Sequence, residues 1–143
     1  TGAIINGNLI TFKQSNMEAK ELRIGNLTEC YINGELKNKF HVVDADDIKI
    51  FLNNDWYVLK PIPLTEEILL RLGFNKDYKN GYIGIDSGNV DFVLTEPFVL
   101  GEWQNCYEFE FIAGGWPKLK KIEYVHDLQN FFYSLCGEEL TLK

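Results

Sequence analysis

The chain has 143 residues, of which 45% are hydrophobic and 24% are charged, and its formal net charge is −7 at pH 7. That length and composition are typical of one folded domain and exclude an intrinsically disordered chain. The acidic balance argues against a nucleic-acid or anionic-membrane partner, since both recruit Lys and Arg, and no apolar run is long enough for a transmembrane helix.

Residues 1–16 stand apart from the rest of the sequence. Met17 follows Gln14-Ser15-Asn16, which is typical of the scar left by a cleavable purification tag, so we expect a tag-derived or flexible leader over 1–16. The alternative is a native hairpin, because two apolar runs flank Asn6-Gly7, a strong two-residue turn signal. Residues 17–143 are expected to form a single α+β domain.

The first part of this domain is predicted to be an antiparallel meander of short strands. Asn33-Gly34 is a type I′ hairpin signal, and Asn53-Asn54-Asp55 separates a second pair of apolar runs. Short strands at this spacing favour a curled sheet or a small barrel. The expected strands are 21–26, 27–32, 35–43, 48–52 and 56–59.

A short helix is predicted where this sheet stops. Pro61 and Pro63 cannot donate to a strand ladder, so they end the sheet. Thr65 is suited to the N-cap of a helix, and Gly73 is suited to the left-handed residue that follows the last turn. We therefore expect a short central helix between these two positions.

The remaining sequence is predicted to return to strands. The clearest alternation places Tyr107, Phe109 and Phe111 on one side of a strand, with glutamates between them. Residues 114–117 are interpreted as a loop because they hold two glycines and a proline. The expected strands are 82–85, 90–94 and 107–111.

A longer amphipathic helix is predicted near the end of the sequence. It is expected to begin near Leu119 or Ile122 and to end at Gly137, with a short closing strand over 138–142. Its apolar stripe should cover one face of the sheet. The predicted fold class is therefore α+β: a mainly antiparallel sheet with a short central helix and a C-terminal amphipathic helix packed on it.

Catalytic chemistry finds little support in the sequence. Asp44, Asp46 and Asp47 could supply oxygen ligands, but the spacing of a calcium-binding loop is absent, so we interpret them as a solvated turn between strands. The alternative is an enzyme site built from these carboxylates and a histidine. The three cysteines form no CxxC pair and are expected to be reduced thiols. We predict no catalytic residue, no metal site and no cofactor.

Two groups of residues are candidates for binding a partner. The first is a basic cluster beside an aromatic ring, a pattern that can follow single-stranded nucleic acid. The second consists of polar residues that flank the apolar stripe of the last helix. The first group is Trp116, Lys118, Lys120 and Lys121, and the second is His126, Gln129 and Asn130.

Three stretches of the sequence resemble a known family. They are residues 21–26 (ELRIGN), 61–74 (PIPLTEEILLRLGF), and 124–130 (YVHDLQN) with 137–141 (GEELT). They resemble a family of small proteins from gut bacteria and their prophages and other mobile elements, to which no activity is assigned. The resemblance spans 17–143 and implies a cytoplasmic, phage-related protein, without indicating catalytic residues.

The leading hypothesis is a non-enzymatic protein-interaction module. Aromatic residues make up 14% of the chain, and aromatic side chains are favoured in binding surfaces. We therefore expect a homodimer or a protein partner that contacts an aromatic surface. The alternative is a phage accessory protein that binds single-stranded nucleic acid through the basic cluster.

Overall fold

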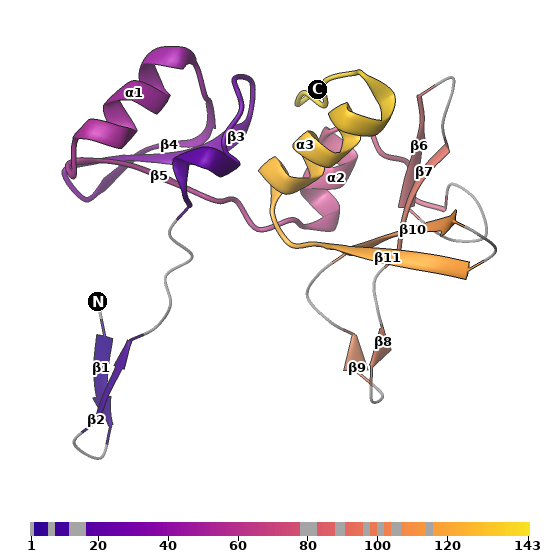
Figure 1. The fold of residues 1–143 in the computed structure, drawn as a ribbon, viewed down its shortest axis with the longest axis horizontal. Helices are drawn as coiled ribbons and strands as arrows, with labels where there is room; N and C mark the ends of the chain where they lie inside the picture. Colours follow the sequence, from indigo (N-terminus) through magenta and orange to yellow (C-terminus); the bar gives the residue numbers. More distant parts are fainter. Residues whose placement is uncertain are drawn as a thin grey trace.

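The computed structural model describes residues 2–5, 8–11, 17–77, 83–87, 91–95, 98–99, 102–103, 107–113 and 116–143, with side chains placed for 17–77, 83–87, 92–94 and 121–143. Two lobes lie side by side: an N-terminal lobe (17–60) and a C-terminal lobe (61–143) (Figure 1). Antiparallel sheets and helices together confirm the predicted α+β class.

The N-terminal lobe is a three-stranded antiparallel sheet covered by one helix. The sheet order is β4-β3-β5, so β4 and β5 both pair with β3, and helix α1 connects them. Asn33 and Gly34 both have positive φ, which confirms the type I′ turn between β3 and β4. The bounds are β3 Leu27–Ile32, β4 Glu35–Val42, α1 Ala45–Asn53 and β5 Tyr57–Lys60.

Two predicted strands in this lobe are wrong. Residues 48–52 belong to helix α1, because Asp44 and Asp47 form a reciprocal capping box and the helix buries one side against the sheet. Residues 21–26 contain the end of a short 3-10 helix, η1 (Ala19–Glu21), followed by a turn in which Gly25 has a φ of 94°. The short apolar runs fit either period, so the sequence pattern does not distinguish a strand from a helix at these positions.

The C-terminal lobe has a four-stranded antiparallel sheet in the order β11-β10-β7-β6, with helices α2 and α3 between it and the N-terminal lobe (Figure 1). The predicted central helix is confirmed as α2. Thr65 Oγ1 accepts the N–H of Ile68, and Gly73 has a φ of 96° while Phe74 donates its N–H to Leu69 O. The bounds are α2 Glu66–Arg71, β6 Ile83–Asp86, β7 Asp91–Thr95, β10 Tyr107–Ala113, β11 Trp116–Ile122 and α3 Val125–Cys136.

Three expectations for the last part of the chain are corrected. Residues 116–122 form strand β11, which pairs with β10 along its whole length, instead of a loop and a helix start. Helix α3 therefore begins later than predicted, at Val125, although it ends at Gly137 as expected. Residues 138–142 form no strand. They are held instead by side-chain packing, since Leu140 and Leu142 contact the larger core.

The described strands do not close into a barrel. Besides the two larger sheets, they form two small hairpins, and no strand of one sheet pairs with another sheet. The small barrel is thus wrong, because the two larger sheets are both open. The hairpin strands are β1 Gly2–Ile5 with β2 Asn8–Thr11, and β8 Phe98–Val99 with β9 Glu102–Trp103.

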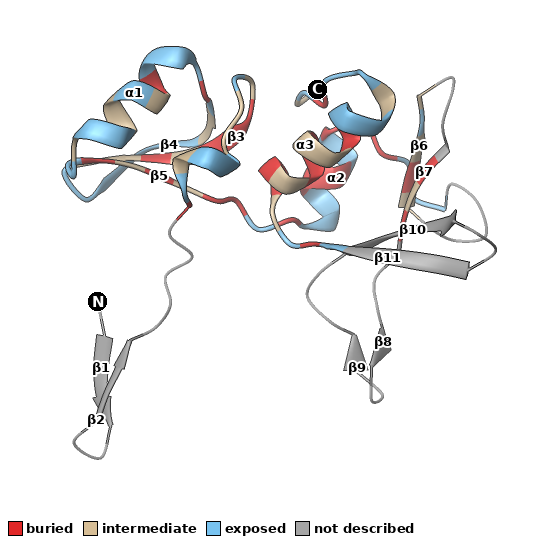
Figure 2. Ribbon diagram, viewed as in Figure 1, coloured by how far each residue is buried: buried red, intermediate tan, exposed pale blue. Residues whose placement is uncertain are grey.

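Each lobe has its own core, and the larger one crosses the boundary between them (Figure 2). Met17, Cys30 and Leu59 belong to the smaller core under α1. The larger core holds Phe92 and Phe132 but also Leu27 from β3, so the lobes share apolar packing. None of the helices in the described part of the chain is long and apolar enough to cross a membrane.

Replacement of Asp44 by Ala tests the capping box. Asp44 accepts the N–H of Asp47 at 2.9 Å, and loss of such a cap costs about 1 kcal/mol in the free energy of unfolding. Urea denaturation should show this loss. Asp46→Ala is the matched control, because Asp46 is an exposed residue in the same turn, and its effect should be about 0.5 kcal/mol or less. Equal effects would contradict the capping role.

Candidate functional site

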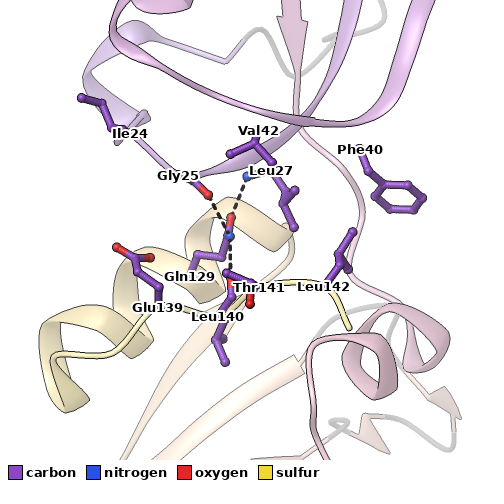
Figure 3. Close-up of a pocket in the computed structure, with 10 residues that line it drawn as sticks. All are labelled: Ile24, Gly25, Leu27, Phe40, Val42, Gln129, Glu139, Leu140, Thr141 and Leu142. Carbon is purple, nitrogen blue, oxygen red and sulfur yellow. Dashed lines mark hydrogen bonds between the residues drawn. The ribbon is translucent and has the colours of Figure 1, made fainter.

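Gln129 joins the two lobes through a single buried side chain. It lies on α3 and is fully buried. Its Oε1 accepts the N–H of Leu27 at 2.8 Å, and its Nε2 donates to Gly25 O at 3.2 Å and to Leu140 O at 2.9 Å (Figure 3). One carboxamide therefore holds the start of β3, the turn before it, and the segment that follows α3.

Asn130 and Arg23 extend this seam to the surface. Asn130 Oδ1 accepts hydrogen bonds from Asn26 Nδ2 at 2.8 Å and from Arg23 Nε at 3.2 Å. The Arg23 guanidinium also pairs in a bidentate manner with the Glu139 carboxylate and lies 4.2 Å from the centre of the Tyr133 ring. The predicted recognition residues Gln129 and Asn130 are thus engaged inside the protein.

His126 is buried at the start of α3. Its ring stacks on Tyr124, and its Nε2 lies 3.4 Å from Asp127 Oδ1 and 3.8 Å from Glu21 Oε2. Its Nδ1 has no hydrogen-bond partner among the described residues. Burial lowers the pKa of His126, while the carboxylates of Asp127 and Glu21 oppose that shift. His126 is therefore an internal residue, and its ring is not presented to a partner.

An acid–histidine pair does form in the N-terminal lobe. The carboxylate of Asp47 accepts hydrogen bonds from Tyr57 Oη and from the N–H of Asp44, the latter at 2.8 Å. It also pairs with His41 Nε2 at 2.8 Å. Burial raises the pKa of Asp47, but these hydrogen bonds outweigh burial and hold the pKa below its ordinary value. Burial, and then the bond to Asp47, raise the pKa of Tyr57.

This network corrects the interpretation of the acidic cluster. Asp44 and Asp46 are exposed as expected of a turn, but Asp47 is buried and fixes the first turn of α1 to the sheet. Neither Asp47 nor His41 lines either of the two cavities described for the chain. Within the described residues, no three acidic, histidine or cysteine side chains are grouped so as to hold a metal ion.

A cleft of about 410 Å³ opens between the two lobes (Figure 3). Its walls are mostly apolar, and Ile24 and Val42 at its N-terminal-lobe side are each 59% exposed. Two polar side chains of its lining already have partners, since Gln129 bonds backbone groups and Glu139 pairs with Arg23. The lining residues are Ile24, Gly25, Leu27, Phe40, Val42, Gln129, Glu139, Leu140, Thr141 and Leu142.

A second, smaller cavity of about 290 Å³ lies beside β5. It takes in all four residues of that strand together with Met17 and Phe51 from the smaller core. Asn54 and Asp55 add polar groups at the turn before the strand. Its more polar lining and its smaller size make it a weaker candidate than the cleft between the lobes.

Of the predicted basic cluster, only Lys121 has a described side chain, and it lines neither cavity. Trp116, Lys118 and Lys120 occupy alternate positions of β11, and their side chains lie outside the described residues. Lys121 is exposed, and its Nζ pairs with Glu123 Oε1 at 2.6 Å. Among the predicted binding residues whose side chains are described, Gln129 lines the cleft, whereas Lys121, His126 and Asn130 do not.

Most of the cleft was missed by sequence reasoning. The sequence predicts strands at Ile24 and Val42 and a closing strand that includes Leu140 and Leu142, but it gives no signal that these residues line one cleft. Comparisons with protein-family models, with curated proteins and with solved structures give no match. The case for the cleft as a functional site therefore comes from the structure of this chain, without support from a related protein.

Replacement of Gln129 by Met tests the seam between the lobes. Met has a similar volume but no amide, so the N–H of Leu27 and the carbonyls of Gly25 and Leu140 lose a buried partner. We expect the free energy of unfolding to fall by about 2 kcal/mol or more, measured by urea denaturation. Ser134→Ala, at an exposed site of the same helix, is the control, and an equal effect would contradict the role of Gln129.

The lowered pKa of His126 predicts a pH dependence of stability. Between its ordinary pKa of about 6.5 and its lower folded value, the unfolded chain binds a proton that the folded chain does not. Stability should therefore fall as the pH decreases below about 6.5, and His126→Gln should reduce that slope in urea titrations. His41→Gln is the control, because it removes the other histidine and leaves His126 in place. An unchanged slope in His126→Gln would refute the prediction.

Proposed function

We propose that the protein is an interaction module that receives an apolar side chain or short apolar segment of a protein partner in the cleft between its lobes. The observation that carries this proposal is a cleft of about 410 Å³ with mostly apolar walls and exposed apolar residues at its edge. Ligand-binding cavities fall in this size range and lie preferentially between structural units.

The chemistry of the lining favours an apolar occupant. The amide of Gln129 and the carboxylate of Glu139 already have partners, so a polar ligand would gain few hydrogen bonds on entering. Burial of a side chain the size of leucine contributes roughly 1.5–3 kcal/mol. The occupant would thus bind mainly through the removal of apolar surface from water.

Two features favour a protein over a small solute. Ile24 and Val42 are exposed, and a partner surface would cover them while inserting a side chain between the lobes. The formal charge of −7 favours a partner with a basic surface around its apolar segment, and it disfavours a second copy of this chain. The aromatic side chains of the described core are largely buried, so Phe40 is the aromatic residue that the cleft offers.

The three motifs contact one another in the fold, since the N–H of Val125 in the third motif donates to Ile62 O in the second at 2.9 Å. Residues of the first motif, 21–26, bond directly to those of the third, 124–130 and 137–141, through Arg23, Gln129 and Glu139. The resemblance of these motifs to small proteins of gut bacteria and their prophages supports extending the proposal to a cytoplasmic, phage-related protein, and their mutual contacts support a role of the motifs in maintaining the cleft.

The double variant Ile24→Gln/Val42→Gln tests the cleft. Both residues are exposed, so the fold should persist while apolar surface at the cleft is lost. We expect the affinity for the neutral fluorescent probe N-phenyl-1-naphthylamine to fall about tenfold, or about 1.4 kcal/mol. Leu52→Gln, which is 65% exposed on α1 and outside the cleft lining, should leave the affinity unchanged.

Selection from a library of displayed random peptides tests the partner class. The proposal expects peptides with one or two large apolar residues among basic ones, whose binding is lost in the double variant. Peptides that bind the double variant equally well would contradict the proposal. A stable dimer in sedimentation equilibrium that is lost in the double variant would also contradict it, because a second copy of the chain would then occupy the cleft.

A further inference from the structure

The segment 138–143 forms one wall of the cleft without belonging to a helix or strand. The chain turns back after Gly137, whose φ is 71°, and Leu140 enters the larger core with only 3% exposure. Glu139, Leu140, Thr141 and Leu142 all line the cleft (Figure 3). The opposite wall comes from the N-terminal lobe, so an occupant would contact this segment and that lobe together.

A small number of contacts hold this segment in place. Glu139 pairs with Arg23, Leu140 O accepts from Gln129 Nε2 at 2.9 Å, and Lys143 donates its N–H to Arg71 O at 2.8 Å. Segments held without a ladder are typically among the first to open locally. We therefore expect release of the segment to cost less than unfolding of a lobe, since it exposes Leu140 and breaks these contacts but breaks no strand ladder.

Gln129 connects the segment with the other wall of the cleft. The same Nε2 that donates to Leu140 O also donates to Gly25 O, and Oε1 accepts from the N–H of Leu27. Gly25, Leu27 and Leu140 all line the cleft. Docking of the segment and the position of the N-terminal-lobe wall thus depend on one carboxamide.

We propose that residues 138–143 act as a strap whose docking is coupled to occupancy of the cleft. This inference rests on the proposed function, because it concerns the same apolar site. An occupant that contacts both walls binds better when the strap is docked, so it shifts the strap toward the docked state. By linkage, release of the strap weakens binding by the same factor.

Hydrogen exchange of the amides of 138–143 in the full chain tests the coupling directly. Saturating N-phenyl-1-naphthylamine should slow exchange of these amides about fivefold or more, as expected for typical coupling between sites. The measurement uses the unaltered protein, so it does not depend on any variant folding. Unchanged exchange with bound probe would overturn the strap, while the proposed cleft would stand.

Arg23→Gln tests the reciprocal effect. Arg23 does not line the cleft, but it pairs with Glu139. Its loss should therefore speed hydrogen exchange of the amides of 138–143 and lower the affinity for the probe, with similar fold-changes in the two quantities. Lys20→Gln is the control, because it removes another cation whose exposed side chain pairs with Glu18. Full affinity in Arg23→Gln would overturn the coupling. Absence of probe binding to the unaltered chain would instead overturn the proposed function and the strap with it.

Discussion

The buried carboxamide of Gln129 determines how the two halves of the chain fit together. Its partners lie 102 to 104 residues earlier, at Leu27 and Gly25, and 11 residues later, at Leu140. A buried amide that lacked these partners would cost about 1–3 kcal/mol for each group left unpaired. The position of α3 against β3 is therefore fixed by the directions of these hydrogen bonds as well as by apolar packing.

This arrangement explains why an apolar cleft persists between the lobes. The polar seam formed by Gln129, Asn130 and Arg23 lies at one side of the boundary, and the shared core around Leu27 lies beneath it. One wall of the cleft comes from the N-terminal lobe, and the other comes from residues 139–142, which follow α3 and belong to no helix or strand. The lobes thus combine a hydrogen-bonded junction with an apolar cleft, and this combination supports the proposed binding role.

The candidate site was only partly predictable from the sequence. The polar residues of the YVHDLQN motif flank an apolar stripe, which predicts binding residues, and Gln129 does line the cleft. The sequence could not show which segments these residues face, since Arg23 and Asn130 are 107 positions apart. It suggested recognition of a partner, whereas the structure shows internal hydrogen bonds, because burial of a side chain depends on contacts that no local pattern encodes.

The sequence by itself determined the features that depend on a few neighbouring residues. Thr65, Gly73 and Gly137 set the ends of helices, and Asn33-Gly34 set a hairpin, because caps and turns require particular side chains or positive φ. Only the tertiary structure decided that 48–52 is helical, that 116–122 is a strand and that a cleft separates the lobes. Short apolar runs fit either period, and the choice follows from the distant surface against which each run is buried.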